Sequence, residues 1–178
     1  ITTVVGEKFG VPVGIHTHDD TGVAVANALA SVQAGATQIQ GTVNGYGERV
    51  GNCNLTTTIP NLQLKMGHPL VPDIGRLSHL ASFVDDLANC SHNNRAPYVG
   101  ASAFAHKGGM HVNAVQKVAH SFEHVEPGTV GNRQRILVSE LSGQSNVLMK
   151  AEELGLPVDK GSDEARAILH DLKEKEEQ

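Results

Sequence analysis

The chain has 178 residues, and its 14 Lys and Arg against 19 Asp and Glu give a formal net charge of −5 at pH 7. This acidic balance argues against nucleic acid or an anionic membrane as the partner. No apolar run approaches the roughly 18 residues of a membrane-spanning helix, and Cys53 and Cys90 stand in no metal-type spacing. We therefore expect a reduced, cytoplasmic setting.

The first part of the chain alternates predicted strands and helices. Residues 1–9 are typical of the end of a helix, and a helix is again expected over 54–66. Strands are expected over 11–16 and 38–43, with a further helix between them. Strand, helix, strand, loop and helix in this order indicate a parallel α/β sheet.

The apolar residues predict which faces of these helices are buried. Gly10 and Gly35 terminate the first two helices in the usual C-terminal position, and Thr21 is placed to cap the second. The faces expected to be buried are Val4, Val5 and Phe9 in the first helix and Val25, Ala26, Leu29 and Val32 in the second.

After about residue 67 the alternation stops and helices dominate. Asp73 is expected to cap a helix, and an irregular stretch broken by Pro and Gly follows over 89–111. Two more helices are expected, one over 139–155 and one that begins at Ser162. The predicted apolar faces are Ile74, Leu77, Ala81, Val84 and Ala88 in the first of these helices and Ala165, Ile168, Leu169 and Leu172 in the last.

These patterns predict an α/β part over 1–70 and helical linker subdomains over 71–178. Two parallel βα units cannot form a stable sheet alone, because their strands need neighbours on both sides and helices on both faces. We therefore expect the chain to be a piece of a larger protein.

Side chains with metal-binding chemistry follow the predicted strands. His16 and His18 are separated by one residue, so they point to the same face of the strand. Ligands of parallel α/β folds bind at the carboxyl ends of the strands. The second strand leads to Asn44, and its loop brings Glu48 and Asn52 to the same rim. Two imidazoles with oxygen ligands suit a divalent ion and leave positions open for substrate.

Simpler interpretations of these residues stay open from the sequence. A single histidine at a strand end is more often a satisfied core residue than a ligand. The loop NGYGERVGN has neither the dinucleotide nor the P-loop pattern, so its glycines can serve only to turn the backbone. Asp19 and Asp20 can orient the histidines or cap the next helix.

For the other histidines and Cys53, the sequence alone does not favour a catalytic or metal-binding role. His68 and His79 are expected at the surface, and Cys53 is expected to pack as a small residue. His106 has a structural and a functional interpretation of equal weight. No role follows from the spacing of His92, His120, His124 and His170.

The segment GIHTHDDTGVAVANALASVQAGATQIQGTVNGYGERVGNCNL resembles the end of the barrel in the acetyl-CoA-dependent aldol synthases, namely 2-isopropylmalate, homocitrate and citramalate synthases. The family pattern is H-x-H followed by N-G-x-G-E-R-x-G-N. Downstream, SAFAHKGGMHVNAV and VGNRQRILVSELSGQSNV resemble the citramalate synthase branch most. The resemblance implies the last two βα units of a TIM (β/α)8 barrel, followed by a mostly helical linker subdomain.

The resemblance also implies roles for individual residues. It makes His16, His18 and Asn52 the protein ligands of a divalent metal (Mg²⁺, Mn²⁺ or Zn²⁺) and places Glu48 near the reacting centre. His111 corresponds to a histidine that the helical subdomain sends into an active site, often that of the partner subunit. We expect His111 to transfer the proton, with Glu48 orienting it or sharing the proton. The family's remaining ligand, an Asp, and the adjacent Arg are not among these residues.

The implied reaction condenses acetyl-CoA, as co-substrate, with a 2-oxo acid, and the downstream motifs favour pyruvate and hence citramalate. A metal ion polarises the keto carbonyl, and thioester hydrolysis completes the reaction in branched-chain amino-acid biosynthesis. A homodimer is expected, and no residues are assigned to acetyl-CoA. Asn113 and Phe122 depart from an Asp and a Tyr that are common elsewhere in the family.

Three alternatives remain. One is a 2-isopropylmalate synthase that uses 2-oxoisovalerate. Another is a non-catalytic assembly module that packs through its apolar helical stripes. A metal-dependent lyase of the same superfamily shares the barrel pattern, but HKGGMH and SELSGQSN belong to the synthases.

Overall fold

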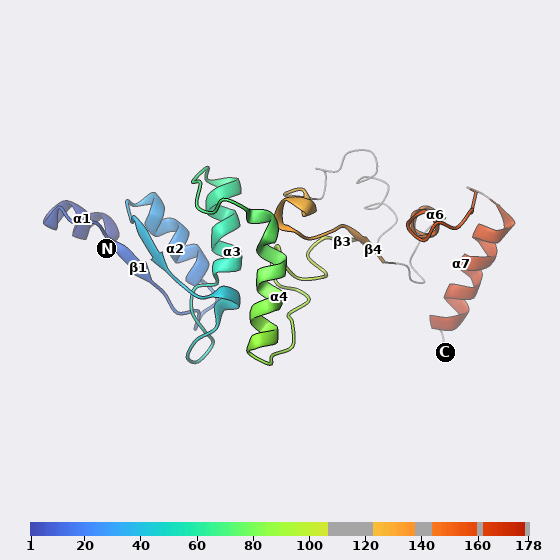
Figure 1. The fold of residues 1–178 in the computed structure, drawn as a ribbon, viewed down its shortest axis with the longest axis horizontal. Helices are drawn as coiled ribbons and strands as arrows, with labels where there is room; N and C mark the ends of the chain where they lie inside the picture. The colour runs from blue at the N-terminus through green and yellow to red at the C-terminus, as the bar shows by residue number, and fades with distance from the viewer. Residues whose placement is uncertain (107–122, 138–143, 160–161, 177–178) are drawn as a thin grey trace.

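The structure is a computed structural model that describes residues 1–106, 123–137, 144–159 and 162–176. Its elements follow one another along the long axis of the molecule, from α1 at one end to α7 at the other (Figure 1). None of the helices in these described ranges is long and apolar enough to cross a membrane. The N-terminal elements are α1 (Thr2–Phe9), β1 (Gly14–His16), α2 (Ala24–Gln33), β2 (Gln38–Gln40) and α3 (Leu55–Pro60).

The two N-terminal strands form the predicted parallel pair. Ile15 lies opposite Ile39, and both side chains pack against a buried cluster made of Ala24, Ala28 and Cys53. Each strand has only three residues, fewer than the sequence predicts. The packing of Cys53 as a small buried residue is confirmed.

Small residues bring α2 close to the sheet. Its buried residues are Ala24, Ala28 and Ser31, so the predicted face is wrong at Ala26, which is exposed. The expected cap at Thr21 is also wrong. The Asp19 carboxylate accepts the Ala24 N–H at 2.8 Å instead, because the turn before α2 brings this side chain over the first helical amide.

Helix α1 has the predicted extent, but its predicted buried face is wrong. It ends at Gly10, which adopts the left-handed conformation with φ 60°. Val4 and Phe9 are 63% and 62% exposed. Val5 is half-buried, and no residue of α1 is fully buried. Amphipathic spacing indicates a face that is able to pack but does not show that a partner covers it.

The helix predicted over 54–66 is divided in two. The Asn54 side chain caps α3 by accepting the Thr56 N–H at 2.9 Å. After Pro60 the chain continues as a π-helical turn over Asn61–Lys65, closed by the bond from Met66 N to Asn61 O. Pro60 lacks the N–H of a regular helix, and the wider turn follows it directly.

The helical part begins where the sequence predicts. Asp73 caps a 3-10 turn over Ile74–Arg76, which leads into α4 (Leu77–Leu87). Helix α4 packs on a core cluster that includes residues from far along the chain. The buried members of this cluster are Leu77, Ala81, Tyr98, Val99, Phe104 and Val130.

The apolar stripe predicted for α4 is partly right. Leu77 and Ala81 are buried as expected, whereas Ala88 is exposed. The third buried residue of the helix is Asp85, only 5% exposed, a polar position that the stripe did not include.

The remaining elements follow in chain order. The stretch predicted as irregular contains β3, whose two residues pair in parallel with β4. Helix α7 begins with the predicted cap, since Ser162 Oγ accepts the Ala165 N–H at 3.2 Å. The predicted helix end at Gly155 is confirmed, with φ 68° there. The bounds are β3 (Ala105–His106), β4 (Arg135–Ile136), α6 (Gln144–Glu153) and α7 (Asp163–Glu176).

Candidate metal centre

Two imidazoles face each other at the end of β1. The Nε2 atoms of His16 and His18 lie 3.2 Å apart, and their ring centroids are 5.1 Å apart with an interplanar angle of 60°. This is the shared face that strand alternation predicts. Two nitrogens each bound at about 2.1 Å to one ion lie at most about 4.2 Å apart, so the observed separation is compatible with a shared ion.

Asn52 lies directly beside this pair. Its backbone forms an isolated antiparallel bridge with His18, supported by the bond from Cys53 N to Thr17 O at 3.0 Å. The Asn52 Nδ2 donates to the carbonyl of Tyr46 at 2.9 Å. Asn52 Oδ1 and His18 Nδ1 are buried, and neither has a hydrogen-bond partner among the residues that the structure describes.

The glycines of the loop keep it tight around Asn52. A Cβ on Gly47 would lie 2.1 Å from Asn52 Nδ2, and a Cβ on Gly51 would lie 1.9 Å from the carbonyl oxygen of Gly45. Gly51 also has φ 107°, a conformation that L-residues adopt at a cost. The glycines therefore turn the backbone, as the simpler interpretation of the sequence holds.

The tip of the same loop is fixed by a charged pair. Arg49 donates to both carboxylate oxygens of Asp20, at 2.5 and 2.8 Å. The hydrogen bond from Arg49 holds the pKa of the Asp20 carboxyl below its usual value, and the same bond raises the pKa of Arg49. Of the two acids behind the histidines, Asp19 thus caps α2 and Asp20 pairs with the loop.

Glu48 lies exposed in this loop, between Gly47 and Arg49. Its carbonyl accepts the Gly51 N–H at 3.0 Å, so its backbone is held within the tight turn. His111, Asn113 and Phe122 lie outside the described residues.

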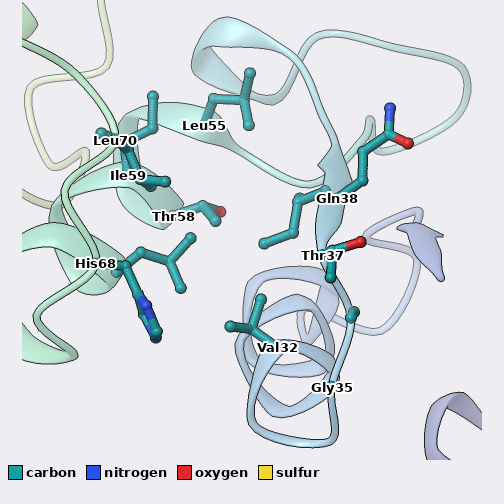
Figure 2. A pocket seen from close by; sticks show the side chains of 12 residues that line it. Val32, Gly35, Thr37, Gln38, Leu55, Thr58, Ile59, His68 and Leu70 are labelled. Carbon is teal, nitrogen blue, oxygen red and sulfur yellow. The ribbon is translucent and has the colours of Figure 1, made fainter. Parts of the chain in front are cut away.

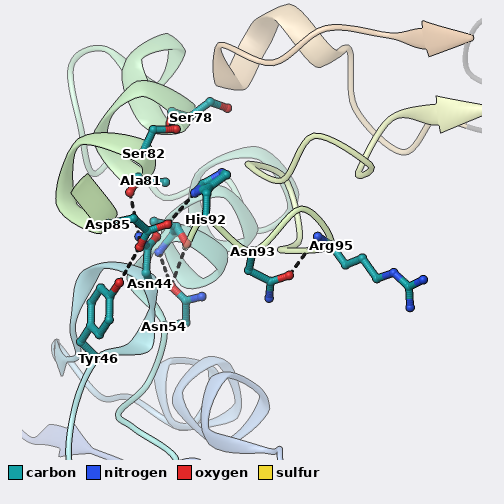
Figure 3. A network of polar contacts seen from close by, with 11 residues as sticks. Asn44, Tyr46, Asn54, Ser78, Ala81, Ser82, Asp85, His92, Asn93 and Arg95 are labelled. Atoms are coloured by element: carbon teal, nitrogen blue, oxygen red, sulfur yellow. Dashed lines mark hydrogen bonds and ion pairs between the residues drawn. The ribbon is translucent and has the colours of Figure 1, made fainter. Parts of the chain in front are cut away.

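A buried polar network that sequence reasoning missed joins the loop to α4 (Figure 3). Asp85 Oδ1 accepts from Asn44 Nδ2 at 2.5 Å and from the Tyr46 hydroxyl at 2.7 Å. His92 Nδ1 lies 2.5 Å from Asp85 Oδ2. His92, to which the spacing assigned no role, thus has a defined partner. One signal in the sequence was available: Asp85 follows Ala81 by four residues, on the buried side of the helix.

The charge of Asp85 is set by opposing effects. Burial alone would raise the pKa of this carboxyl, but hydrogen bonds from Tyr46, His92 and Asn44 outweigh burial and keep the pKa below its usual value. The same bond to Asp85 strongly raises the pKa of the Tyr46 hydroxyl. Asp85 is therefore an ionised acceptor and Tyr46 a protonated donor at neutral pH.

Four other histidines within the described residues have defined surroundings, whereas His120 lies outside those residues. His68 and His79 are exposed, as predicted. His106 Nε2 lies 3.2 Å from Glu123 Oε1, at the end of β3. His124 packs edge-on against Tyr98, with ring centroids 4.9 Å apart, and burial lowers its pKa.

Clusters of three potential ligands drawn only from His, Cys, Asp and Glu are scarce. Within the described ranges, the only such cluster comprises His170, Asp171 and Glu174, all exposed on α7. Neighbouring acidic groups on a solvated helix commonly occur without a metal ion. The candidate centre at His16 and His18 differs because its third donor is a carboxamide.

An apolar cavity of about 540 Å³ lies between α2, β2 and α3 (Figure 2). Val32 points into it from one side, and Leu55 and Ile59 point into it from the other. The cavity shares no residue with the histidine pair or with the glycine-rich loop, and its only titratable lining residue is His68.

Comparison with known families matches both parts of the chain. Residues 2–84 match the HMGL-like family model, and residues 98–178 match the model described as homocitrate synthase post-HMGL domain-like. The first match contains the histidine pair and the glycine-rich loop, and the second contains the β3–β4 pair and the last helices. Residues 2–84 of the chain thus form an HMGL-like segment.

The relatives most relevant to the substrate are two citramalate synthases and one probable 2-isopropylmalate synthase. The chain is 49% identical to the (R)-citramalate synthase of Synechocystis sp., over all of this chain and 34% of the relative. It is 48% identical to the (R)-citramalate synthase of Aquifex aeolicus, with the same coverage of both chains. A probable 2-isopropylmalate synthase of Methanopyrus kandleri is 39% identical over 89% of this chain and 32% of the relative. The chain thus spans about a third of the length of these curated relatives.

Proposed function

We propose that the protein containing this chain condenses acetyl-CoA with pyruvate to form citramalate, and that it does so as a cytoplasmic homodimer. The observation that carries the proposal is the pair of imidazole nitrogens 3.2 Å apart, with Asn52 bridged to His18 through the backbone and its buried Oδ1 without a hydrogen-bond partner within the described residues. The similarity to two (R)-citramalate synthases at 49% and 48% identity supports this choice of substrates.

In this proposal, residues 1–70 form the last two βα units of a TIM (β/α)8 barrel and residues 71–178 form helical linker subdomains. The parallel pairing of β1 with β2 and the packing of α2 against it support the barrel units. The core shared by Leu77 and Ala81 with Phe104 and Val130 supports a separate unit downstream.

The donor set fits a divalent metal ion. His16 and His18 would hold the ion through nitrogen, and Asn52 would hold it through Oδ1, because its Nδ2 is already used by the Tyr46 carbonyl. Imidazole nitrogen with amide oxygen suits Mg²⁺, Mn²⁺ or Zn²⁺, in order of increasing preference for nitrogen. When bound, the ion acts as a Lewis acid on the keto carbonyl of the 2-oxo acid.

The remaining steps belong to the chain's own side chains. A ring nitrogen of His111 takes a proton from the acetyl-CoA methyl group, and the carbanion so formed bonds to the keto carbon. The π electrons of the keto carbonyl move to its oxygen, which takes up a proton and becomes the hydroxyl of the product. Glu48 is exposed on the loop that carries Asn52, where its carboxylate is available to orient the imidazole or share the proton. Water then hydrolyses the thioester and releases CoA, which makes the condensation irreversible.

The test is an assay of the complete protein that contains these residues. CoA release is followed with pyruvate and separately with 2-oxoisovalerate, each with added Mg²⁺ or Mn²⁺. We expect release with pyruvate, and loss of at least about 100-fold in kcat/KM for His16→Ala or His111→Ala. Exposed His79→Ala is the matched control and should be unaffected.

Two outcomes would redirect the proposal. Faster turnover with 2-oxoisovalerate would favour 2-isopropylmalate synthase, for which the Methanopyrus relative at 39% identity is the supporting observation. A folded protein that releases no CoA with either acid would refute catalysis and favour an assembly module.

A further inference from the structure

Tyr46 links the side chain of Asn52 to helix α4. Tyr46 accepts the Asn52 Nδ2 hydrogen bond at its carbonyl, and its own hydroxyl donates to Asp85 on α4 at 2.7 Å. The Tyr46 carbonyl also accepts from Thr42 Oγ1 at 2.5 Å. Tyr46 therefore connects the candidate metal ligand Asn52 to a buried carboxylate of the helical part; Figure 3 shows its contact with Asp85.

Asp85 is well suited to act as an anchor. It is only 5% exposed, and its two oxygens are engaged by three different side chains from two segments. Asn44 binds both Asp85 and the Ala81 carbonyl at 2.8 Å, which fixes the start of the loop with φ 58° at Asn44. Hydrogen bonds to an ionised group are roughly twice as strong as neutral ones, so the loop is held firmly to α4.

The orientation of the Asn52 carboxamide decides whether it can be a ligand. Its two ends are nearly isosteric, but only the oxygen has lone pairs for a cation, whereas the NH₂ group is a donor. The Tyr46 carbonyl accepts hydrogen bonds and cannot donate one, so it selects the rotamer in which Nδ2 faces Tyr46. Oδ1 is then the end left buried and without a partner among the described residues.

We propose that Asp85 is a positioning residue, which acts through Tyr46 to hold the Asn52 carboxamide with its oxygen presented to the divalent ion. This inference rests on the proposed function, because it takes the His16, His18 and Asn52 set as the metal site. By this inference a residue of α4, in the helical part, changes the metal affinity of the α/β part through Tyr46.

The test measures Mn²⁺ binding to the complete protein by calorimetry, together with the melting temperature of each variant. Tyr46→Phe removes only the hydroxyl and keeps both the ring and the carbonyl. Asp85→Asn removes the charge, and Asp86→Asn is the matched control because Asp86 is the exposed neighbour on the same helix. Asn52→Ala removes the ligand itself.

We expect Asn52→Ala to weaken Mn²⁺ binding by about 10- to 100-fold, and Tyr46→Phe and Asp85→Asn to weaken it by about 10-fold. Asp86→Asn should bind like the unchanged protein. A merely structural network would lower the melting temperature of Tyr46→Phe and leave its Mn²⁺ affinity unchanged. The Tyr46→Phe measurement therefore decides the matter even if Asp85→Asn fails to fold.

The outcomes separate this inference from the proposed function. If Asn52→Ala binds Mn²⁺ normally, the metal site is wrong and the inference falls with it. If Asn52→Ala binds weakly while Tyr46→Phe binds like Asp86→Asn, the positioning role is refuted and the metal site stands.

Discussion

Replacing Gly51 with alanine tests whether the tight loop is what holds Asn52 in place. Gly51 has φ 107°, and an added Cβ would lie 1.9 Å from the Gly45 carbonyl oxygen. That same oxygen accepts the Asn52 N–H at 2.9 Å. The substitution therefore introduces backbone strain of about 1–3 kcal/mol and displaces an acceptor whose hydrogen bond contributes about 1 kcal/mol.

Together these effects should destabilise the loop by about 2–4 kcal/mol. We expect hydrogen exchange in peptides covering residues 44–52 to accelerate by about 30- to 1,000-fold, since each 1.4 kcal/mol is a factor of ten. The assay is exchange followed by mass spectrometry on the complete protein.

Gly35 provides the matched control for backbone strain. It has φ 101°, and an added Cβ would meet nothing within 4 Å. Gly35→Ala should therefore carry similar strain at its own position and leave exchange in 44–52 unchanged. The reasoning is refuted if Gly51→Ala also leaves exchange in the loop unchanged, because the close approach to Gly45 would then have no energetic effect.

Further predictions concern helix capping and acid stability. Asn54→Ala removes the cap that accepts the Thr56 N–H and should cost about 1 kcal/mol, measurable as a lower melting temperature; an unchanged value would contradict the cap. The pKa of Asp85 is lowered by Tyr46, His92 and Asn44 against the opposing effect of burial. Its stabilisation should be complete above about pH 4, the unfolded value, and lost as the pH falls through the folded one. Melting curves between pH 2 and 6 should show this loss in the parent and not in Asp85→Asn; equal slopes would contradict it.

What could be predicted from the sequence was mainly local. The caps at Asp73 and Ser162 are confirmed because each involves a side chain and an amide two or three residues away. The facing histidines follow from the alternation of side chains along a strand. At α2 the capping residue is Asp19, for which capping was one of two roles left open, and not Thr21; the sequence could not choose because Asp19 reaches Ala24 across five residues, through a turn whose shape it does not specify.

Longer-range features could not be read from the sequence. The β3–β4 pair joins two-residue strands whose starts, Ala105 and Arg135, lie 30 positions apart, so neither has a run long enough to show period-two alternation. The face of α2 was misplaced by the choice of Ala26, since alanines occur on both sides of this helix. Ala24 and Ala28 are buried because they pack with Cys53 and the two strands, a tertiary contact that the helix sequence does not reveal.

Asp85 shows most clearly that the candidate site includes residues outside the sequence motifs. The apolar stripe predicted for α4 passes from Ala81 to Val84 and Ala88 and leaves Asp85 out, yet Asp85 is buried, and a buried carboxylate is destabilising unless it is hydrogen-bonded. Its partners Asn44 and Tyr46 come from the glycine-rich loop, about 40 positions earlier. The burial of Asp85 can therefore be understood only once the fold has brought the loop and α4 together. The cost of burying the Asp85 carboxylate is offset by the hydrogen bonds that hold the loop. Such departures from apolar patterning are expected at functional sites.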